Sequence, residues 1–183
     1  FNVIYTEKKT DEYRLYICKK SLENQLYRIF ELADRNKITE YIKYFNSLNF
    51  KDFYGDFSID EKYYIVFKHP DGIIAGDSDW KKLSAKDIVK ALVLQNPPIE
   101  IAVPMLSFNN IFVYEKEIRF AYVLPMLDNR ACKGLLEEKL ADMIDLIWSE
   151  HRTPEAKRWL DSLRRGKFSH LVIALKYMPE NEK

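Results

Sequence analysis

The aspartates of the segment 52–60 are the residues of this sequence with the most direct potential for chemistry. Asp52, Asp56 and Asp60 recur at intervals of four. If the segment is a strand, Asp52 and Asp56 share one face, because successive side chains alternate. Paired carboxylates can act as general acid and base, so one hypothesis is an enzyme of unrecognised type that uses these three aspartates. The competing interpretation is a solvated, charged face.

The other reactive side chains form no recognisable constellation. His69, His151 and His170 are scattered, and no spacing of His, Cys, Asp and Glu matches a metal site. Ser107 lacks the G-x-S-x-G context of a nucleophile elbow. The sequence therefore predicts no catalytic nucleophile, no metal and no cofactor.

Composition and charge exclude several classes of protein. The chain has 183 residues, of which 47% are hydrophobic, enough for one domain or two small lobes. Its 29 basic and 28 acidic residues give a net charge of +1, which disfavours nucleic acid as a partner. Cys18 and Cys132 allow one disulfide at most and favour a reducing compartment. No apolar run is long enough to span a bilayer.

Aromatic residues are unusually frequent: 12 Tyr, 11 Phe and 3 Trp. We expect most of them in the core and on sheet faces. Tyrosines that stay exposed would suit a protein–protein interface. The candidate interaction surface comprises Tyr63, Tyr64 and the loop around Trp80.

The first half of the chain is predicted to be rich in strands. Four runs have strand character: 1–4, Tyr13–Lys19, 50–57 and Lys62–Lys68. Apolar residues at helical spacing predict a helix over 22–33, with Ser21 as its N-cap. A further helical turn or two is expected over 39–45.

The second half combines one hairpin with helices. Ser84 is expected to cap a helix that Pro97 and Pro98 end. The stretch 104–125 reads PMLSFNNIFVYEKEIRFAYVLP, in which a loop precedes two short apolar runs around a charged tip. Three further helices are predicted over 135–149, 153–166 and 168–178, the second with Thr153 as N-cap and Pro154 at its first position. The segregated elements indicate an α+β fold.

This order of elements resembles that of a protein kinase. Residues 1–68 correspond to the β-rich small lobe, and 69–80 to the hinge and linker. Phe108–Tyr122 is similar to the kinase stretch from the catalytic-loop Asn to the metal-binding motif. The resemblance implies a reduced, bilobal, protein-kinase-like fold in one domain spanning 1–183, with 69–183 forming the hinge, the hairpin and the helical lobe.

The departures from the kinase pattern concern catalysis. Kinases use a Gly-rich loop, a strand Lys, a catalytic Asp and a D-F-G motif. The first glycine here is Gly55, and Lys19 or Lys20 would have to supply the strand lysine. If Asn110 takes the position of the loop Asn, Met105 takes that of the catalytic Asp, and 122–124 replaces D-F-G. The resemblance therefore implies a pseudokinase, not an enzyme.

Among such domains, the chain resembles the cytosolic N-terminal domain of the EssB/YukC family of the type VII secretion system of Gram-positive bacteria. The similar motifs are WKKLS at 80–84, SFNNIFV at 107–113 and FAYVLP at 120–125. This resemblance implies a non-catalytic, cytoplasmic interaction domain of a membrane-associated protein, with secretion components as partners and self-association. Membrane contact would come only through the parent chain.

A second relative is the kinase-like domain that precedes forkhead-associated domains in some Firmicutes proteins, which implies a regulatory role in phosphopeptide signalling. The start at Phe1 and the polar tail suggest a fragment of a longer protein. An apolar run of about 20 residues after Lys183 would favour the secretion component.

Overall fold

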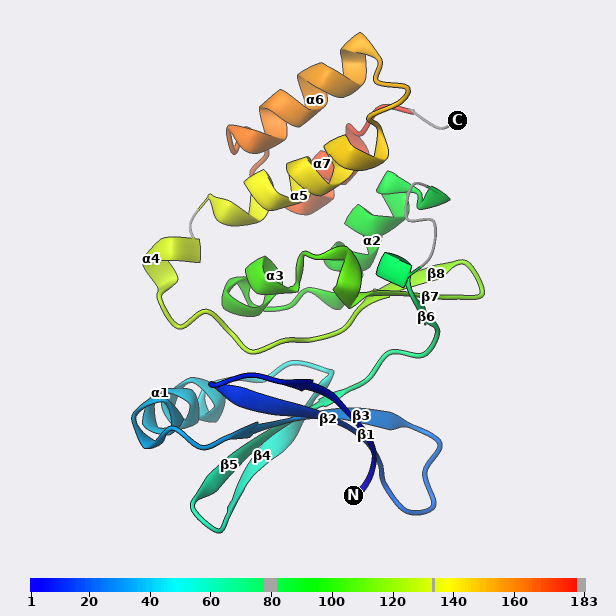
Figure 1. The fold of residues 1–183 in the computed structure, drawn as a ribbon. Coiled ribbons are helices and arrows are strands. Elements are labelled where there is room, and N and C mark those ends of the chain that lie inside the picture. The colour runs from blue at the N-terminus through cyan, green and yellow to red at the C-terminus, as the bar shows by residue number, and fades with distance from the viewer. Residues whose placement is uncertain (78–81, 133, 181–183) are drawn as a thin grey trace. The chain divides into compact units, whose positions relative to one another are not determined.

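The computed structural model describes residues 1–77, 82–132 and 134–180. The chain forms two compact units, Phe1–Pro70 and Asp71–Lys183, which are described separately (Figure 1). Within the described ranges, no helix is both long enough and apolar enough to cross a membrane.

The first unit is an antiparallel sheet with one helix beside it (Figure 1). The strand order is β1-β2-β3-β5-β4. Its elements are β1 (Asn2–Lys9), β2 (Tyr13–Lys19), β3 (Leu26–Leu32), α1 (Arg35–Asn46), β4 (Phe53–Ile59) and β5 (Lys62–Lys68). The four predicted strand runs are all present. Strand β1 extends beyond its predicted end, and β4 begins and ends later than predicted.

The predicted helix over 22–33 is wrong, because β3 occupies Leu26–Leu32. This strand lies between β2 and β5, and both neighbours pair with it along its length. Six of its seven residues are buried. A strand that is buried on both faces has apolar residues without strict alternation, so its sequence also satisfies helical spacing.

Helix α1 packs on one face of this sheet, called here the helix side. Asp34 caps the helix by accepting a hydrogen bond from the Asn36 backbone N–H at 3.0 Å. The Phe45 ring, 2% exposed, stacks on Phe53 with centroids 5.0 Å apart and meets Phe67 at 6.0 Å. The opposite face carries a second cluster of four buried residues, Cys18, Tyr27, Ile29 and Val66. Side chains of the strands themselves cover this cluster.

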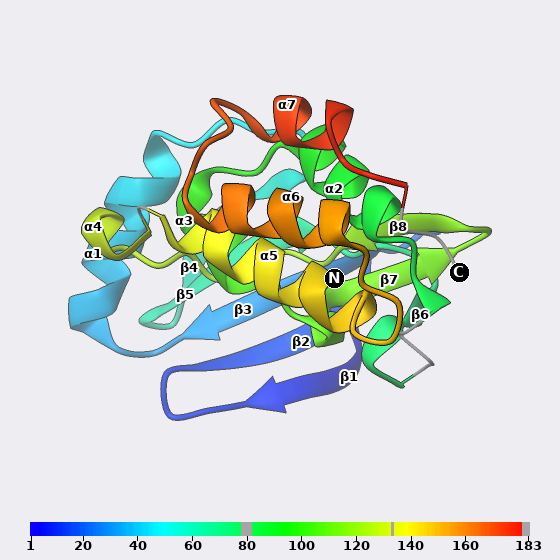
Figure 2. The same cartoon turned by 90° about the horizontal axis from the view of Figure 1, so that it is seen from above.

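The second unit combines a three-stranded sheet with helices (Figure 2). The sheet order is β6-β7-β8. Its elements are β6 (Ile73–Ile74), α2 (Ala85–Gln95), α3 (Ile99–Met105), β7 (Ile111–Tyr114), β8 (Glu117–Phe120), α4 (Asn129–Cys132), α5 (Leu135–Ile147), α6 (Pro154–Arg164) and α7 (Leu171–Lys176). Helices α5 and α6 pack against each other, and Trp159 of α6 donates a hydrogen bond to the Ala174 carbonyl of α7 at 3.0 Å.

Local signals located two helix starts correctly. The Ser84 hydroxyl accepts a hydrogen bond from the Asp87 N–H at 3.3 Å, and Thr153 accepts one from the Ala156 N–H at 3.1 Å. Helix α3 was not predicted, because Pro97 and Pro98 indicate only the end of a helix. The hairpin is confirmed, but β8 ends at Phe120 rather than at 124.

Candidate functional site

The segment predicted to correspond to a kinase catalytic loop is folded tightly upon itself in the second unit. Met105, which the resemblance expects at the position of the catalytic Asp, is 0% exposed. Ser107 begins a 3-10 turn over Phe108–Asn110 by accepting a hydrogen bond from the Asn109 N–H at 3.4 Å. The Asn110 side-chain amide donates to the Met105 carbonyl at 3.3 Å. Asn110 therefore fixes the loop.

The chain that leaves β8, where the resemblance expects a metal-binding motif, has buried side chains. Ala121 and Tyr122 are 0% and 2% exposed. Phe120 is held by the Gln95 amide, which donates to its carbonyl at 2.9 Å and accepts from its N–H at 2.7 Å. The sequence has no acidic residue between Glu117 and Asp128. No group of His, Cys, Asp and Glu side chains within the described ranges could hold a metal ion.

A kinase-type strand lysine is also missing from the first unit. Strand β3, with the sequence LYRIFEL, contains Arg28 but no lysine. Lys19 ends β2, and Lys20 lies beyond it. The Lys20 ammonium pairs with Glu23 at 2.6 Å and donates to the Tyr54 hydroxyl at 3.1 Å. Lys19 and Lys20, the two candidates for a strand lysine, both precede β3.

The structure places the two described residues of the predicted interaction surface on opposite faces of the sheet. Tyr63 and Tyr64 are neighbours on β5 and point to opposite faces. Tyr63 is 1% exposed and donates to Asp56 Oδ2 at 2.7 Å, and burial is the main cause that raises its pKa. Tyr63 is thus a core residue rather than a surface residue. Tyr64 is half-buried on the face opposite α1, and Trp80 lies outside the described residues.

Around Tyr64 the structure assembles a surface that we call the tyrosine face. Tyr16, Phe57 and Tyr64 gather around the carboxylate of Glu31, and Tyr54 lies at the other end of the face beside Tyr27. Glu31 is only 8% exposed. Its Oε2 accepts hydrogen bonds from the hydroxyls of Tyr16 at 3.2 Å and Tyr64 at 3.3 Å. The Phe57 ring stacks on Tyr64, with centroids 4.9 Å apart and an interplanar angle of 15°.

Cations and further rings complete the tyrosine face. Arg14 and Lys62 lie 3.7 and 3.1 Å from Glu31 Oε1. Hydrogen bonding to Glu31 raises the pKa of Lys62. At the other end, the Tyr54 ring meets Tyr27 edge-on at 4.9 Å. Four strands therefore contribute to one ordered aromatic surface that the helix of this unit leaves uncovered.

The three aspartates of the enzyme hypothesis occupy separate places. Asp56, on β4, accepts the Tyr63 hydroxyl. Asp60 is exposed in the β4–β5 turn with a φ of 49°. Asp52 precedes β4, and its carbonyl accepts the Lys68 N–H at 3.0 Å. The turn conformation explains the aspartate at position 60, and the hydrogen bond from Tyr63 explains the one at position 56. Neither explanation requires a catalytic role.

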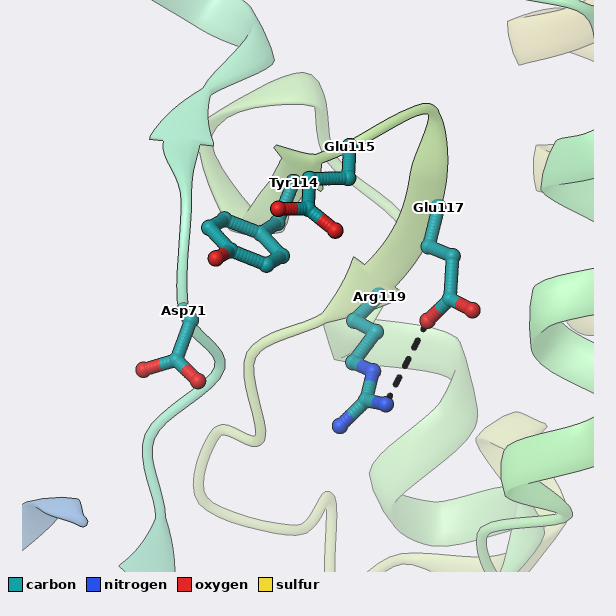
Figure 3. A pocket seen from close by; sticks show the side chains of 5 residues that line it. All are labelled: Asp71, Tyr114, Glu115, Glu117 and Arg119. Carbon is teal, nitrogen blue, oxygen red and sulfur yellow. Dashed lines mark hydrogen bonds and ion pairs between the residues drawn. The ribbon is translucent and has the colours of Figure 1, made fainter. Parts of the chain in front are cut away.

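A cavity of about 230 Å³ lies at the tip of the β7–β8 hairpin (Figure 3). It is lined by Asp71, Tyr114, Glu115, Glu117 and Arg119. The Arg119 guanidinium approaches Glu117 at 3.4 Å, and both side chains are well exposed. The lining is therefore a solvated surface with mixed charges.

Comparisons with known proteins bear on the fold. No protein-family model matches the chain, and no curated protein matches it. Among solved structures, it is similar to the crystal structure of Rad53 1–466 in complex with AMP-PNP, with a TM-score of 0.63 and 11% identity. The match covers 96% of this chain and 63% of that one, so this chain spans less than two thirds of Rad53 1–466. Rad53 is a protein kinase. The likeness confirms the protein-kinase-like fold predicted from the order of elements.

Proposed function

We propose that this chain is a kinase-like domain without phosphotransferase activity that acts through protein interaction. The segment of Met105 and Asn110 carries the first half of this proposal. Phosphoryl transfer requires a carboxylate that positions the hydroxyl nucleophile and carboxylate or amide ligands for Mg²⁺. In this chain the buried Met105 would stand where that carboxylate is required, and the Asn110 side-chain amide already donates a hydrogen bond to the Met105 carbonyl.

The tyrosine face supports the interaction role. Tyrosine is enriched among the residues that dominate binding at protein interfaces. Side chains that are already held in place lose less conformational entropy on binding. Glu31 holds two tyrosine hydroxyls, and Phe57 stacks on one of the same rings.

We further propose that the partners are proteins of a membrane-associated assembly. The support is the resemblance of residues 80–84 and 107–125 to the EssB/YukC domain, which implies a cytoplasmic domain of a type VII secretion component, self-associating in the full-length protein. A regulatory domain of a phosphopeptide-binding signalling protein is the alternative that the same kinase-like fold allows.

A thermal shift with ATP and Mg²⁺ tests the loss of catalysis. We expect the Tm to be the same with and without millimolar nucleotide and metal. A ligand well above its Kd must stabilise a folded protein. A metal-dependent rise in Tm at sub-millimolar ATP would therefore contradict the proposal.

The tyrosine face is tested with two matched substitutions in the full-length parent protein. Tyr54 is 43% exposed on the tyrosine face, and Tyr114 is 53% exposed on the β7–β8 hairpin. We expect Tyr54→Ala to weaken co-purification with components of the secretion assembly about tenfold, as for an interface residue worth about 1.4 kcal/mol. Tyr114→Ala should have no effect. Equal recovery with both variants would exclude the tyrosine face as the interface.

A further inference from the structure

One end of the tyrosine face carries three cations from three strands. Strand register places Lys9 of β1 opposite Arg14 of β2, and Arg14 opposite Glu31 of β3. Residues paired in this way lie on the same face of a sheet. Lys62 of β5 reaches the same carboxylate, with its ammonium 3.1 Å from Glu31 Oε1. We call Lys9, Arg14 and Lys62 the basic cluster of the tyrosine face.

The basic cluster presents its positive charge to solvent. Arg14 and Lys62 share one oxygen of Glu31, and their side chains are 46% and 40% exposed although that glutamate is buried. Lys9 is exposed as well. Hydrogen bonding to Glu31 raises the pKa of Lys62, whereas the like charge of Arg14 lowers it. One buried carboxylate therefore serves a group of more exposed cations that repel one another.

The acids of the adjoining turns do not neutralise Arg14 and Lys62. These acids are Asp11 between β1 and β2, and Asp60 and Glu61 between β4 and β5. Hydrogen bonding to Tyr16 and attraction to Glu31 raise the pKa of Arg14. The carboxylate that raises the pKa of Lys62 is also that of Glu31. Within the described residues, Glu31 is thus the carboxylate that acts on both cations.

Aromatic rings beside the basic cluster favour a polypeptide as its partner. Phe57 stacks on Tyr64, and register places Tyr64 opposite Glu31, in the same row as Arg14. Such a row suits a segment that combines carboxylates with apolar side chains, because rings supply contact area and complementary charges fix its register. Nucleic acids and anionic bilayers usually require larger clusters of basic residues, and the net charge of this chain is +1.

We propose that the basic cluster of the tyrosine face binds an acidic segment of a partner protein. Carboxylates of this segment pair with Lys9, Arg14 and Lys62 from the solvent side. An apolar side chain next to them packs on the stacked rings of Phe57 and Tyr64. The inference rests on the interaction role proposed above and adds the chemistry of the partner.

Charge reversal at Lys9 tests this chemistry at an exposed side chain. Fluorescence anisotropy measures the Kd of the full chain for a labelled copolymer of Glu and Tyr, which supplies both carboxylates and rings. We expect Lys9→Glu to raise this Kd about tenfold, because one attractive charge becomes repulsive. Lys90→Glu on α2 makes the same change in net charge at another exposed lysine and should alter the Kd less than about twofold.

Three results with the copolymer would overturn the proposal. These are equal effects of the two charge reversals, binding that added salt does not weaken, and binding of phosphatidylserine vesicles without binding of the copolymer. Urea midpoints of both variants verify that they are folded. If Lys9→Glu does not fold, Lys62→Gln takes its place, with Lys90→Gln as its control and the same outcomes.

Co-purification with the full-length parent protein separates this inference from the proposed function. Lys9→Glu should reduce recovery of components of the secretion assembly, as Tyr54→Ala does, and Lys90→Glu should not. If Tyr54→Ala loses these components but Lys9→Glu keeps them, the tyrosine face is an interface and the acidic partner is refuted. If neither substitution changes recovery, the interaction role of the tyrosine face and this inference both fail.

Discussion

Replacing Glu31 with glutamine tests whether one buried carboxylate organises the tyrosine face. The substitution keeps the side-chain volume but removes the charge that accepts the hydroxyls of Tyr16 and Tyr64. Hydrogen bonds to a charged group contribute about 1.5–3 kcal/mol each, but these two are long, at 3.2 and 3.3 Å. The amide oxygen can still accept both hydroxyls as an uncharged acceptor, but the charge that pairs with Arg14 and Lys62 is lost. We therefore expect a loss of about 1.5 kcal/mol in the free energy of unfolding.

Urea unfolding followed by circular dichroism measures this loss. With a slope of about 2 kcal/mol per M, the midpoint should fall by about 0.7 M. Glu117→Gln is the control, because Glu117 forms an exposed pair with Arg119 and its loss should leave the midpoint unchanged. A shift for Glu31→Gln as small as that of the control would refute the organising role of Glu31.

Two further predictions concern the second unit and alkaline pH. Gln95→Glu should destabilise the fold by about 2 kcal/mol, because a carboxylate cannot replace the side-chain amide that donates to the Phe120 carbonyl at this part-buried site. Gln95→Asn, measured in the same urea series, keeps the amide but shortens the side chain, so it separates the effect of side-chain length from that of charge. Burial is the main cause that raises the pKa of Tyr41 to about 12. The native state therefore holds this proton more tightly than the unfolded state, so stability is complete below pH 10 and falls as the pH rises toward 12. Tyr41→Phe should flatten this alkaline loss of stability in a pH series of unfolding midpoints, and an unchanged slope would contradict the assignment.

Short-range signals in the sequence identified several elements correctly. Ser84 and Thr153 cap helices because a hydroxyl needs only backbone N–H groups two or three residues away. The run Lys62–Lys68 is a strand with the predicted limits. The predicted order of elements led to the protein-kinase-like fold although its early helix was placed at 22–33, where the structure has β3.

The errors arose where tertiary contacts outweigh local pattern. Strand β3 looks helical in sequence because its apolar residues serve both faces of the sheet, and only pairing with β2 and β5 distinguishes the two possibilities. Tyr63 and Tyr64 must point to opposite faces, but the sequence does not say which face packs against α1. Tyr63 therefore entered the predicted surface although it is buried.

The tyrosine face was determined by the tertiary structure alone. Glu31 meets Tyr16 from β2 and Tyr64 from β5, residues that are 15 and 33 positions away in sequence. Strand register brings these side chains together, and a change of one residue would send each to the other face. The sequence by itself determined the strands Tyr13–Lys19 and Lys62–Lys68, the hairpin, and the helices that Ser84 and Thr153 cap. Register and helix packing decided which polar groups are buried together, because that burial depends on neighbours remote in the chain.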